Sequence, residues 1–136
     1  MTLPSIQNWP YPNPKIQIIK EVEAVAKPDA VFATNTSGLL VREIAEAHSR
    51  PENVIGMHYF SPVPKMELLE IIVTDQTSDE TLKQAVQVGL KQKKLIVVAK
   101  DVPGFYCNRC LAPALKEVLR YPPFTQFGLG QFTQFF

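Results

Sequence analysis

Short apolar runs alternate with segments of helical period along this sequence, and this alternation restricts the possible folds more than any other feature. The runs cover residues 30–34, 54–60, 68–73 and 95–99. Between and around them, apolar residues recur every three or four positions from Lys15 onward, over 39–47, over 82–90 and from about Phe105 to Arg120. This order predicts an α/β domain with a mainly parallel sheet, whose ligands bind beyond the carboxyl ends of the strands. Functional residues are therefore expected in the turns after Thr34 and Phe60.

Composition limits the classes of function. With 136 residues, 46% of them hydrophobic, the chain can bury one modest core, so one domain or parts of two are expected. A formal net charge of +1 gives no electrostatic reason to expect a nucleic-acid partner. No apolar run approaches the ~20 residues of a membrane span, and residues 1–14 show neither a signal peptide nor a readable transit peptide.

His58 and Glu70 are the first candidates for chemistry. His58 ends an apolar strand just before a proline-containing turn, where an imidazole can take and return a proton near neutral pH. Glu70 interrupts the run Leu-Leu-Glu-Ile-Ile, and a buried carboxylate there must find a partner, for which His58 is the natural candidate. The alternatives are a strand-end histidine without a catalytic task and an edge-strand acid that faces water.

Small polar residues form a second candidate group. Asn35, Thr36 and Ser37 follow a strand at the mouth of a helix, where their side chains and free backbone N–H groups can face a ligand. Asn108 lies on the first turn of the helix after the Pro-Gly break, and its carboxamide could project toward the same cleft. The alternatives are a simple helix cap for the first group and a solvated helix position for Asn108.

Cys107 and Cys110 form a single C-x-x-C, and two cysteines cannot supply a disulfide framework. A redox pair or half of a zinc site is conceivable. There is no second pair and both histidines lie far upstream, so no metal site is predicted.

Four motifs follow one another in the sequence, namely Asn35-Thr36-Ser37, the segment 58–64 (HYFSPVP), the segment 69–72 (LEII), and Asp101-Val102-Pro103-Gly104-Phe105 with Asn108-Arg109. In this order they resemble the 3-hydroxyacyl-CoA dehydrogenase family. The resemblance spans about 15–120. Within the family, the segments 20–25, 54–60 and 110–113 are most similar to the dehydrogenase region of the mitochondrial trifunctional enzyme's α subunit.

The resemblance implies a fold, a reaction and roles for individual residues. His58 would be the base that removes the 3-hydroxyl proton as hydride passes to NAD, Glu70 would hold it, and Ser37 and Asn108 would contact the reacting part of the acyl chain. Asn35 and Ser37 would lie at the nicotinamide half of NAD, and Lys15 near the cofactor. The implied partner is 3-hydroxyacyl-CoA, with association with other β-oxidation subunits and a mitochondrial location.

Two departures from the family shape the expected domain organisation. The family's strand-Gly-x-Gly-helix start is missing before Lys15, and after Arg120 the sequence becomes an unrelated Phe-rich tail. We therefore expect a proline-rich arm over 1–14 and, over 15–103, the C-terminal half of a Rossmann-like NAD-binding domain without its glycine loop. The first helix of an all-α domain follows over 104–120, and the tail occupies 121–136. A truncated or misassembled reading frame would explain both ends.

Three classes of function remain open at this point. The first is a dehydrogenase module in fatty-acid β-oxidation, which is inactive as an isolated fragment because its cofactor cradle is missing. The second is a non-catalytic remnant or association module of the same fold, which pairs through an exposed sheet edge. The third is a C-x-x-C redox or metal module, which would be indifferent to a change of His58.

Overall fold

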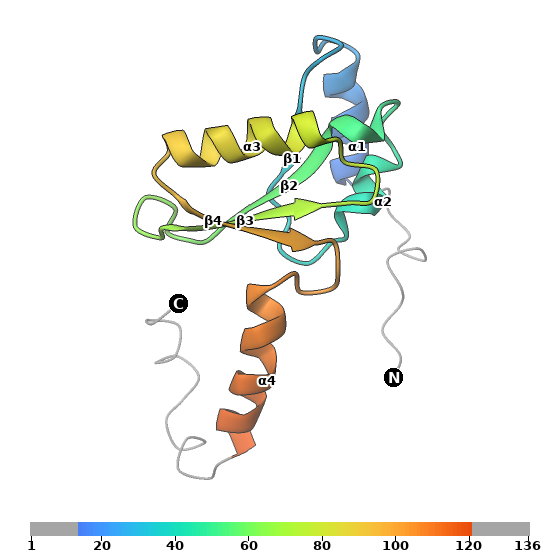
Figure 1. Ribbon diagram of the computed structural model, residues 1–136. Helices are drawn as coiled ribbons and strands as arrows, with labels where there is room; N and C mark the ends of the chain where they lie inside the picture. The colour runs from blue at the N-terminus through green and yellow to red at the C-terminus, as the bar shows by residue number, and fades with distance from the viewer. Residues whose placement is uncertain (1–13, 121–136) are drawn as a thin grey trace, which may run out of the picture.

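The computed structural model describes residues 14–120, so the predicted arm, except Pro14, and the predicted tail lie outside the described residues. The helices and strands follow the order that the sequence indicates, and a loop without a helix joins the second strand to the third (Figure 1). In chain order the elements are α1 (Pro14–Glu23), β1 (Phe32–Thr34), α2 (Val41–Ala45), the 3-10 turn η2 (Pro51–Asn53), β2 (Val54–Tyr59), β3 (Leu68–Val73), α3 (Asp79–Lys91), β4 (Leu95–Lys100) and α4 (Cys107–Arg120). The four predicted strands are all present, and Ser78 caps α3 by accepting a hydrogen bond from the Thr81 N–H.

The four strands form one sheet in the order β1-β2-β3-β4. The pairs β1–β2 and β3–β4 are parallel, as predicted, but β2 and β3 run antiparallel. The reason is the connection 60–67, whose eight residues are too few for the crossover of a dozen or more that a parallel pair needs. This antiparallel register places His58 directly opposite Glu70.

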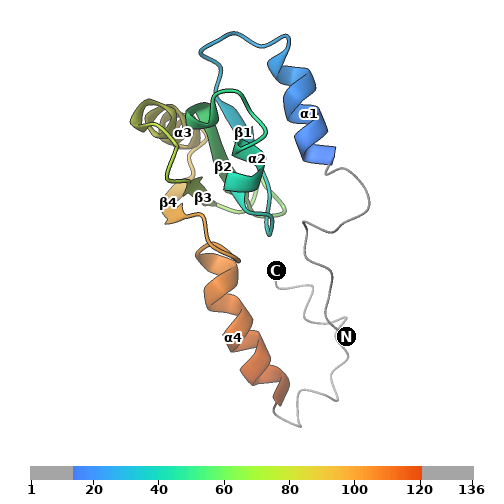
Figure 2. The ribbon, with the colours of Figure 1, turned by 90° about the vertical axis from the view of Figure 1, so that its right-hand side faces the viewer.

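Alternate residues of the central strands fill two cores on opposite faces of the sheet. On one face Val54 and Ile72 pack with α1 and α2, through Ile19, Val41 and Ile44. On the other face α3 covers a cluster of five buried residues, namely Ile55, Met57, Leu69, Ile71 and Ala85. Figure 2 shows the resulting layers, with α3 on one side of the strands and α1 and α2 on the other.

The start of α2 is capped in an unexpected way. The sequence suggested capping by the segment 35–38, yet Thr36 Oγ1 reaches only the Leu39 N–H, at 3.0 Å. The first helical N–H groups, those of Val41 and Arg42, instead donate to the two carboxylate oxygens of Asp101 at 2.9 and 2.8 Å. A residue about sixty positions away therefore fixes the start of α2, which local sequence cannot show.

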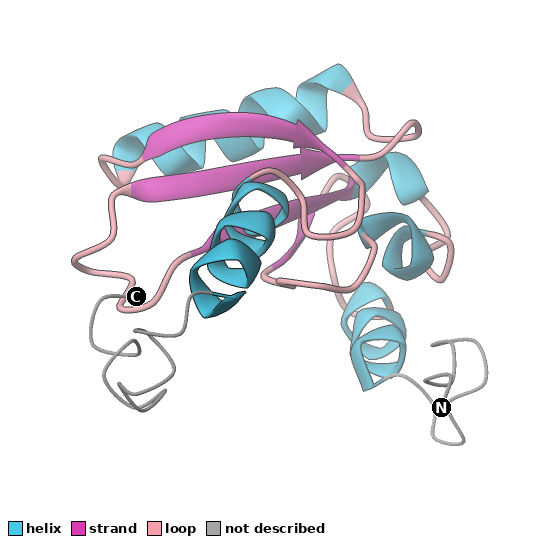
Figure 3. Ribbon diagram, turned by 90° about the horizontal axis from the view of Figure 1, so that it is seen from below, coloured by secondary structure: helices cyan, strands magenta, loops and turns pink. Residues whose placement is uncertain are grey.

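The turn before α4 explains why this helix begins two residues later than predicted. Gly104 and Phe105 both have positive φ, at 78° and 47°, so neither can belong to a right-handed helix. Phe105 is nevertheless 2% exposed, because its ring enters the core on the α2 side of the sheet. From this turn α4 runs away from the sheet (Figures 1 and 3).

The apolar stripe predicted for the first helix is only partly buried. Ile19 packs into the core, whereas Ile18, Val22 and Val25 are 57%, 45% and 86% exposed. The helix is where the period indicated, but two of its apolar side chains, Ile18 and Val22, are largely left exposed by residues 14–120. Within the same residues, no helix combines the length and apolar character needed to cross a membrane.

Candidate active site

His58 and Glu70 meet across the antiparallel β2–β3 pair, as the sequence predicted. The His58 Nδ1 atom lies 2.5 Å from Glu70 Oε2, and the two residues are 6% and 0% exposed. β3 is an interior strand, so Glu70 is not an edge acid facing water. The imidazole and the carboxylate are thus within hydrogen-bond distance, which a general base and the carboxylate that orients it require.

The second carboxylate oxygen of Glu70 is held by the start of α4. Oε1 accepts hydrogen bonds from the backbone N–H groups of Tyr106 at 3.0 Å and Cys107 at 2.7 Å. The helix N-terminus offers unpaired N–H groups and a partial positive charge, both of which stabilise an anion. The left-handed turn at Gly104 and Phe105 delivers these N–H groups to the buried acid.

These contacts decide which nitrogen of His58 carries the proton. An ionised Glu70 has only acceptor oxygens, and the two N–H groups that donate to its Oε1 stabilise this ionised form. The Nδ1–H of His58 must then donate to Oε2, which leaves the lone pair of Nε2 available for a substrate proton. The pair is thus arranged for a general base whose cationic form is stabilised by a neighbouring negative charge.

Two aromatic rings surround the imidazole. The ring centroids of Phe60 and Phe105 lie 4.6 and 5.7 Å from that of His58. Apolar walls exclude water and strengthen the electrostatic interaction between His58 and Glu70.

Two of the predicted polar residues come together at this site. The Asn108 Nδ2 atom donates to the backbone carbonyl of Ser37 at 3.3 Å, which joins α4 to the turn after β1. Asn108 is therefore not a purely solvated helix position. Ser37 is exposed, and its hydroxyl has no hydrogen bond among the described residues.

The three predicted cofactor residues are only partly brought together. Lys15 and Asn35 line one hollow of about 350 Å³ between α1 and β1, with an otherwise mainly apolar wall that includes Ile18, Phe32 and Ile44. Ser37 does not line it. The hollow runs along β1, since Phe32, Ala33 and Thr34 all line it, and Asn35 lies just beyond the carboxyl end of this strand. Polar groups at the carboxyl ends of parallel strands are where such sheets bind their ligands. The first glycine of the sequence is Gly38, so the chain itself supplies no Gly-x-Gly cradle for the pyrophosphate before β1.

Several residues that shape the site carried no signal in the sequence. The Lys94 Nζ atom donates to the carbonyls of Val63 and Met66 at 2.6 and 2.7 Å, and so holds the loop between His58 and Glu70. Tyr59 donates its hydroxyl to Gln92 Oε1 at 2.7 Å. These contacts join positions about thirty residues apart, which neither spacing nor composition predicts.

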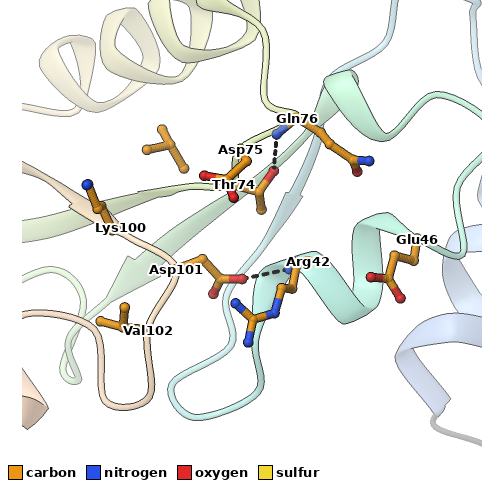
Figure 4. A pocket seen from close by; sticks show the side chains of 9 residues that line it. Arg42, Glu46, Thr74, Asp75, Gln76, Lys100, Asp101 and Val102 are labelled. Atoms are coloured by element: carbon orange, nitrogen blue, oxygen red, sulfur yellow. Dashed lines mark hydrogen bonds between the residues drawn. The ribbon is translucent and has the colours of Figure 1, made fainter.

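A larger hollow of about 490 Å³ lies elsewhere, between the ends of β3 and β4 and the start of α2 (Figure 4). Arg42 and Lys100 stand on its walls together with the carboxylates of Glu46, Asp75 and Asp101. Asp101 is already engaged with the backbone of α2, as the dashed line in Figure 4 shows. Neither His58 nor Glu70 lines this hollow, so it is not part of the candidate active site.

The two cysteines lie in different environments. Cys110 is exposed, whereas Cys107 is half-buried beside Glu70. Burial, and then the negative charge of Glu70, raise the pKa of the Cys107 thiol to about 11. Since the thiolate is the nucleophile and the metal ligand, this environment suppresses both chemistries. Residues 14–120 also contain no cluster of three or more His, Cys, Asp or Glu that could hold a metal ion.

A mixed α/β sheet with a polar turn after β1, and a buried histidine–carboxylate pair on its two central strands, define a nucleotide-binding dehydrogenase type of domain. The family described as "3-hydroxyacyl-CoA dehydrogenase, NAD binding domain" matches residues 11–102. This chain belongs to that family, whose cofactor is NAD.

Two bacterial proteins show what this chain is similar to. The fatty acid oxidation complex subunit alpha of Vibrio vulnificus is 52% identical over 103 residues, which are 76% of this chain and 15% of that protein. The protein of the same name from Shewanella loihica is 50% identical over 105 residues, which are 77% of this chain and 15% of that protein. The chain thus spans about 15% of the length of these relatives, and they lend no support to the expected mitochondrial likeness.

Solved structures show the same fold. The (S)-3-hydroxybutyryl-CoA dehydrogenase of Ralstonia eutropha superposes with a TM-score of 0.75 at 33% identity, over 85% of this chain and 43% of that one. The 3-hydroxybutyryl-CoA dehydrogenase of Escherichia coli gives a TM-score of 0.71 at 31% identity, over 79% of this chain and 24% of that one. The Rossmann-like fold predicted from the sequence is confirmed.

Proposed function

We propose that this chain carries the proton-transfer half of a dehydrogenase that oxidises 3-hydroxyacyl-CoA to 3-ketoacyl-CoA in fatty-acid β-oxidation. One observation carries the proposal. His58 is buried with Nδ1 fixed by Glu70, and Glu70 is fixed in turn by the start of α4, so a single imidazole nitrogen is left for substrate. The names of the relatives, a fatty acid oxidation complex subunit and 3-hydroxybutyryl-CoA dehydrogenases, support the substrate class.

The residues present account for one side of the reaction. The His58 Nε2 atom takes the proton of the 3-hydroxyl group while the C3–H bond breaks and a carbonyl forms, and Glu70 stabilises the imidazolium that results. NAD, when bound, supplies the acceptor for the hydride that leaves C3. Asn35 and Ser37 would lie at its nicotinamide end and Lys15 near the cofactor, while Ser37 and Asn108 would contact the reacting part of the acyl chain.

The chain alone should have little or no activity, because it lacks the glycine cradle for the pyrophosphate. We propose that it works together with a glycine-loop half, supplied in a longer polypeptide or by a partner, and within an assembly of other β-oxidation subunits. A mitochondrial location rests on the sequence resemblance alone, and fractionation of source cells with an antibody to the chain would test it.

Reconstitution tests the proposal. The 136 residues are fused or mixed with a glycine-loop half of a family member, and NADH formation from 3-hydroxybutyryl-CoA is followed. We expect turnover, and His58→Gln should lower it by about 10²–10⁴-fold because the general base is lost. His48→Gln is a matched control, since His48 is also buried but lines no part of the site. Near-normal turnover of His58→Gln would refute the assignment of His58.

A second candidate is an association module without turnover, and the uncovered apolar side chains of α1 favour it. Such a module would unfold cooperatively and bind a sister chain but show no NAD binding by calorimetry, even after reconstitution. NADH formation by the reconstituted wild type would exclude this alternative.

A further inference from the structure

The backbone ladder between β1 and β2 stops short of His58. β1 ends at Thr34, which pairs with Gly56, while β2 continues to Tyr59. Asn35, the residue after β1, places its Oδ1 atom 2.9 Å from the Tyr59 N–H. A side-chain carbonyl thus takes the place of the main-chain acceptor that β1 no longer offers.

This hydrogen bond acts on the backbone of His58 itself. The Tyr59 N–H belongs to the peptide group that begins at the carbonyl carbon of His58, and that group is planar. An acceptor that fixes the plane therefore fixes the ψ angle of His58. Glu70 fixes the imidazole ring, so His58 is held at its backbone and at its side chain by different partners.

We propose that Asn35 is a positioning residue for the base, acting through the His58–Tyr59 peptide group rather than only through the cofactor. The other contacts of this segment come from the turn between α3 and β4, where Gln92 accepts from the Tyr59 hydroxyl and Lys94 holds the loop that follows. Asn35 secures the segment from the side of β1. The expected effect of Asn35 on turnover rests on the proposed function. Its effect on the His58–Tyr59 peptide group does not.

A matched pair of variants separates the two roles of Asn35. Asn35→Asp keeps an oxygen acceptor at the same reach and loses the amide nitrogen, whereas Asn35→Ala loses both. If the oxygen is what matters, aspartate should rescue the positioning that alanine removes. If Asn35 acts only by donating its amide nitrogen to the cofactor, both variants should fail equally.

Amide hydrogen exchange, followed by NMR in the 136-residue chain, measures the positioning directly. We expect Asn35→Ala to speed exchange of the Tyr59 amide about tenfold, as for loss of one hydrogen bond, and Asn35→Asp to stay within about twofold of wild type. The Met57 amide, in the middle of β2, serves as the internal control and should be unchanged. An unchanged Tyr59 amide in Asn35→Ala, or equal acceleration in both variants, would overturn the proposal.

Kinetics of the reconstituted enzyme provide the second measurement. At saturating NAD, kcat should fall about tenfold in Asn35→Ala and recover in Asn35→Asp, while any loss of a cofactor contact appears in the KM for NAD. A wild-type kcat in Asn35→Ala with only a raised KM would contradict positioning. If the reconstituted wild type shows no turnover, the proposed function fails, and the exchange measurement still decides the role of Asn35.

Discussion

Glu70 has no exposed surface, and an ionised carboxylate in such a place costs several kcal/mol unless partners replace the lost water. Its partners are the His58 ring and the N–H groups of Tyr106 and Cys107. Hydrogen bonds to charged groups contribute about 1.5–3 kcal/mol each, so three of them can offset the desolvation. The charge of Glu70 inside the apolar run Leu-Leu-Glu-Ile-Ile is therefore fully hydrogen-bonded and does not leave an unpaired ion in the core.

Replacing Glu70 with glutamine should move the proton on His58. The new side chain can still accept from α4 through its amide oxygen, but its amide nitrogen then donates to Nδ1 of His58. This contact forces the ring proton onto Nε2 and blocks the base. We expect turnover of the reconstituted enzyme to fall about 10²–10⁴-fold. The ¹⁵N shifts of the imidazole should show the change of tautomer.

Glu67→Gln is the control for this substitution, since Glu67 lies on the same hairpin but is exposed. It should leave both turnover and the imidazole shifts unchanged. An unaltered His58 tautomer in Glu70→Gln would mean that the carboxylate does not set it.

The cysteines should differ in reactivity. With its pKa raised to about 11, Cys107 has about 1% thiolate at pH 9. Iodoacetamide should therefore label the exposed Cys110 well before Cys107, as mass spectrometry of tryptic peptides can show. Glu70→Gln should speed labelling of Cys107 because it removes a negative charge that disfavours the thiolate. Equal rates for both cysteines in the wild type would contradict the described environment of Cys107.

At the scale of elements, the turn between α3 and β4 combines strain with a structural task. Lys93 follows α3 with a φ of 58°, a conformation that costs a non-glycine residue about 1–2 kcal/mol. The adjacent residues Gln92 and Lys94 hold Tyr59 and the loop before β3. The strained residue thus lies between two residues that brace the segment carrying His58.

Lys93→Gly should stabilise the chain by about 0.5–1 kcal/mol, because glycine adopts positive φ without steric cost but loses more entropy on folding. Urea unfolding followed by circular dichroism measures the change. Lys91→Gly is the contrast, since Lys91 is the last helical residue of α3, and glycine there should be neutral or destabilising by up to about 1 kcal/mol. Destabilisation by Lys93→Gly would show that the lysine side chain makes a contribution not visible in its contacts.

The start of α2 is fixed by a residue far along the chain. Asp101 binds the first helical N–H groups of α2 from the end of β4. Gly56 makes the close approach of α2 to the sheet possible, since an added Cβ would lie 2.9 Å from Val41 and 2.7 Å from Ile72. A short helix of five residues is thereby fixed by tertiary contacts rather than by its own propensity.

At the scale of the whole molecule, the described residues leave part of the apolar face of α1 exposed, at Ile18 and Val22. Ile18 and Val22 line the hollow beside β1, which is an edge strand in this sheet. An apolar surface next to an unpaired strand edge favours association. We expect the glycine-loop half of the family domain to cover this region.

Val22→Lys should therefore weaken complementation by the glycine-loop half and reduce binding of a hydrophobic dye, without lowering the melting temperature of the chain itself. Dye fluorescence and the titration midpoint of reconstitution are the measurements. Val88→Lys on α3 is the control, since Val88 is 43% exposed but lies away from the β1 edge. Equal effects of both variants would argue against α1 as the contact region.

The sequence by itself determined the elements and the pairing of His58 with Glu70. Apolar period marked each strand and helix to within about three residues, because burial of one face imposes a period on the chain. The charge inside 68–73 indicated that Glu70 needed a partner, because an unpaired buried carboxylate is too costly to retain. The apolar period and the need of Glu70 for a partner both follow from which residues are buried. The tendency to be buried depends on residue type, so the sequence alone shows both.

Tertiary structure alone decided how the pair is held. The cap of α2 by Asp101, the N–H groups of α4 on Glu70, and the Asn35 oxygen on Tyr59 join residues 24 to 60 positions apart. Hydrogen bonds of this kind depend on where strands end and how loops turn, and a polar residue in a turn is compatible with many such partners. The exposed side of α1 has the same origin, because helical period shows which face is apolar but not whether anything covers it.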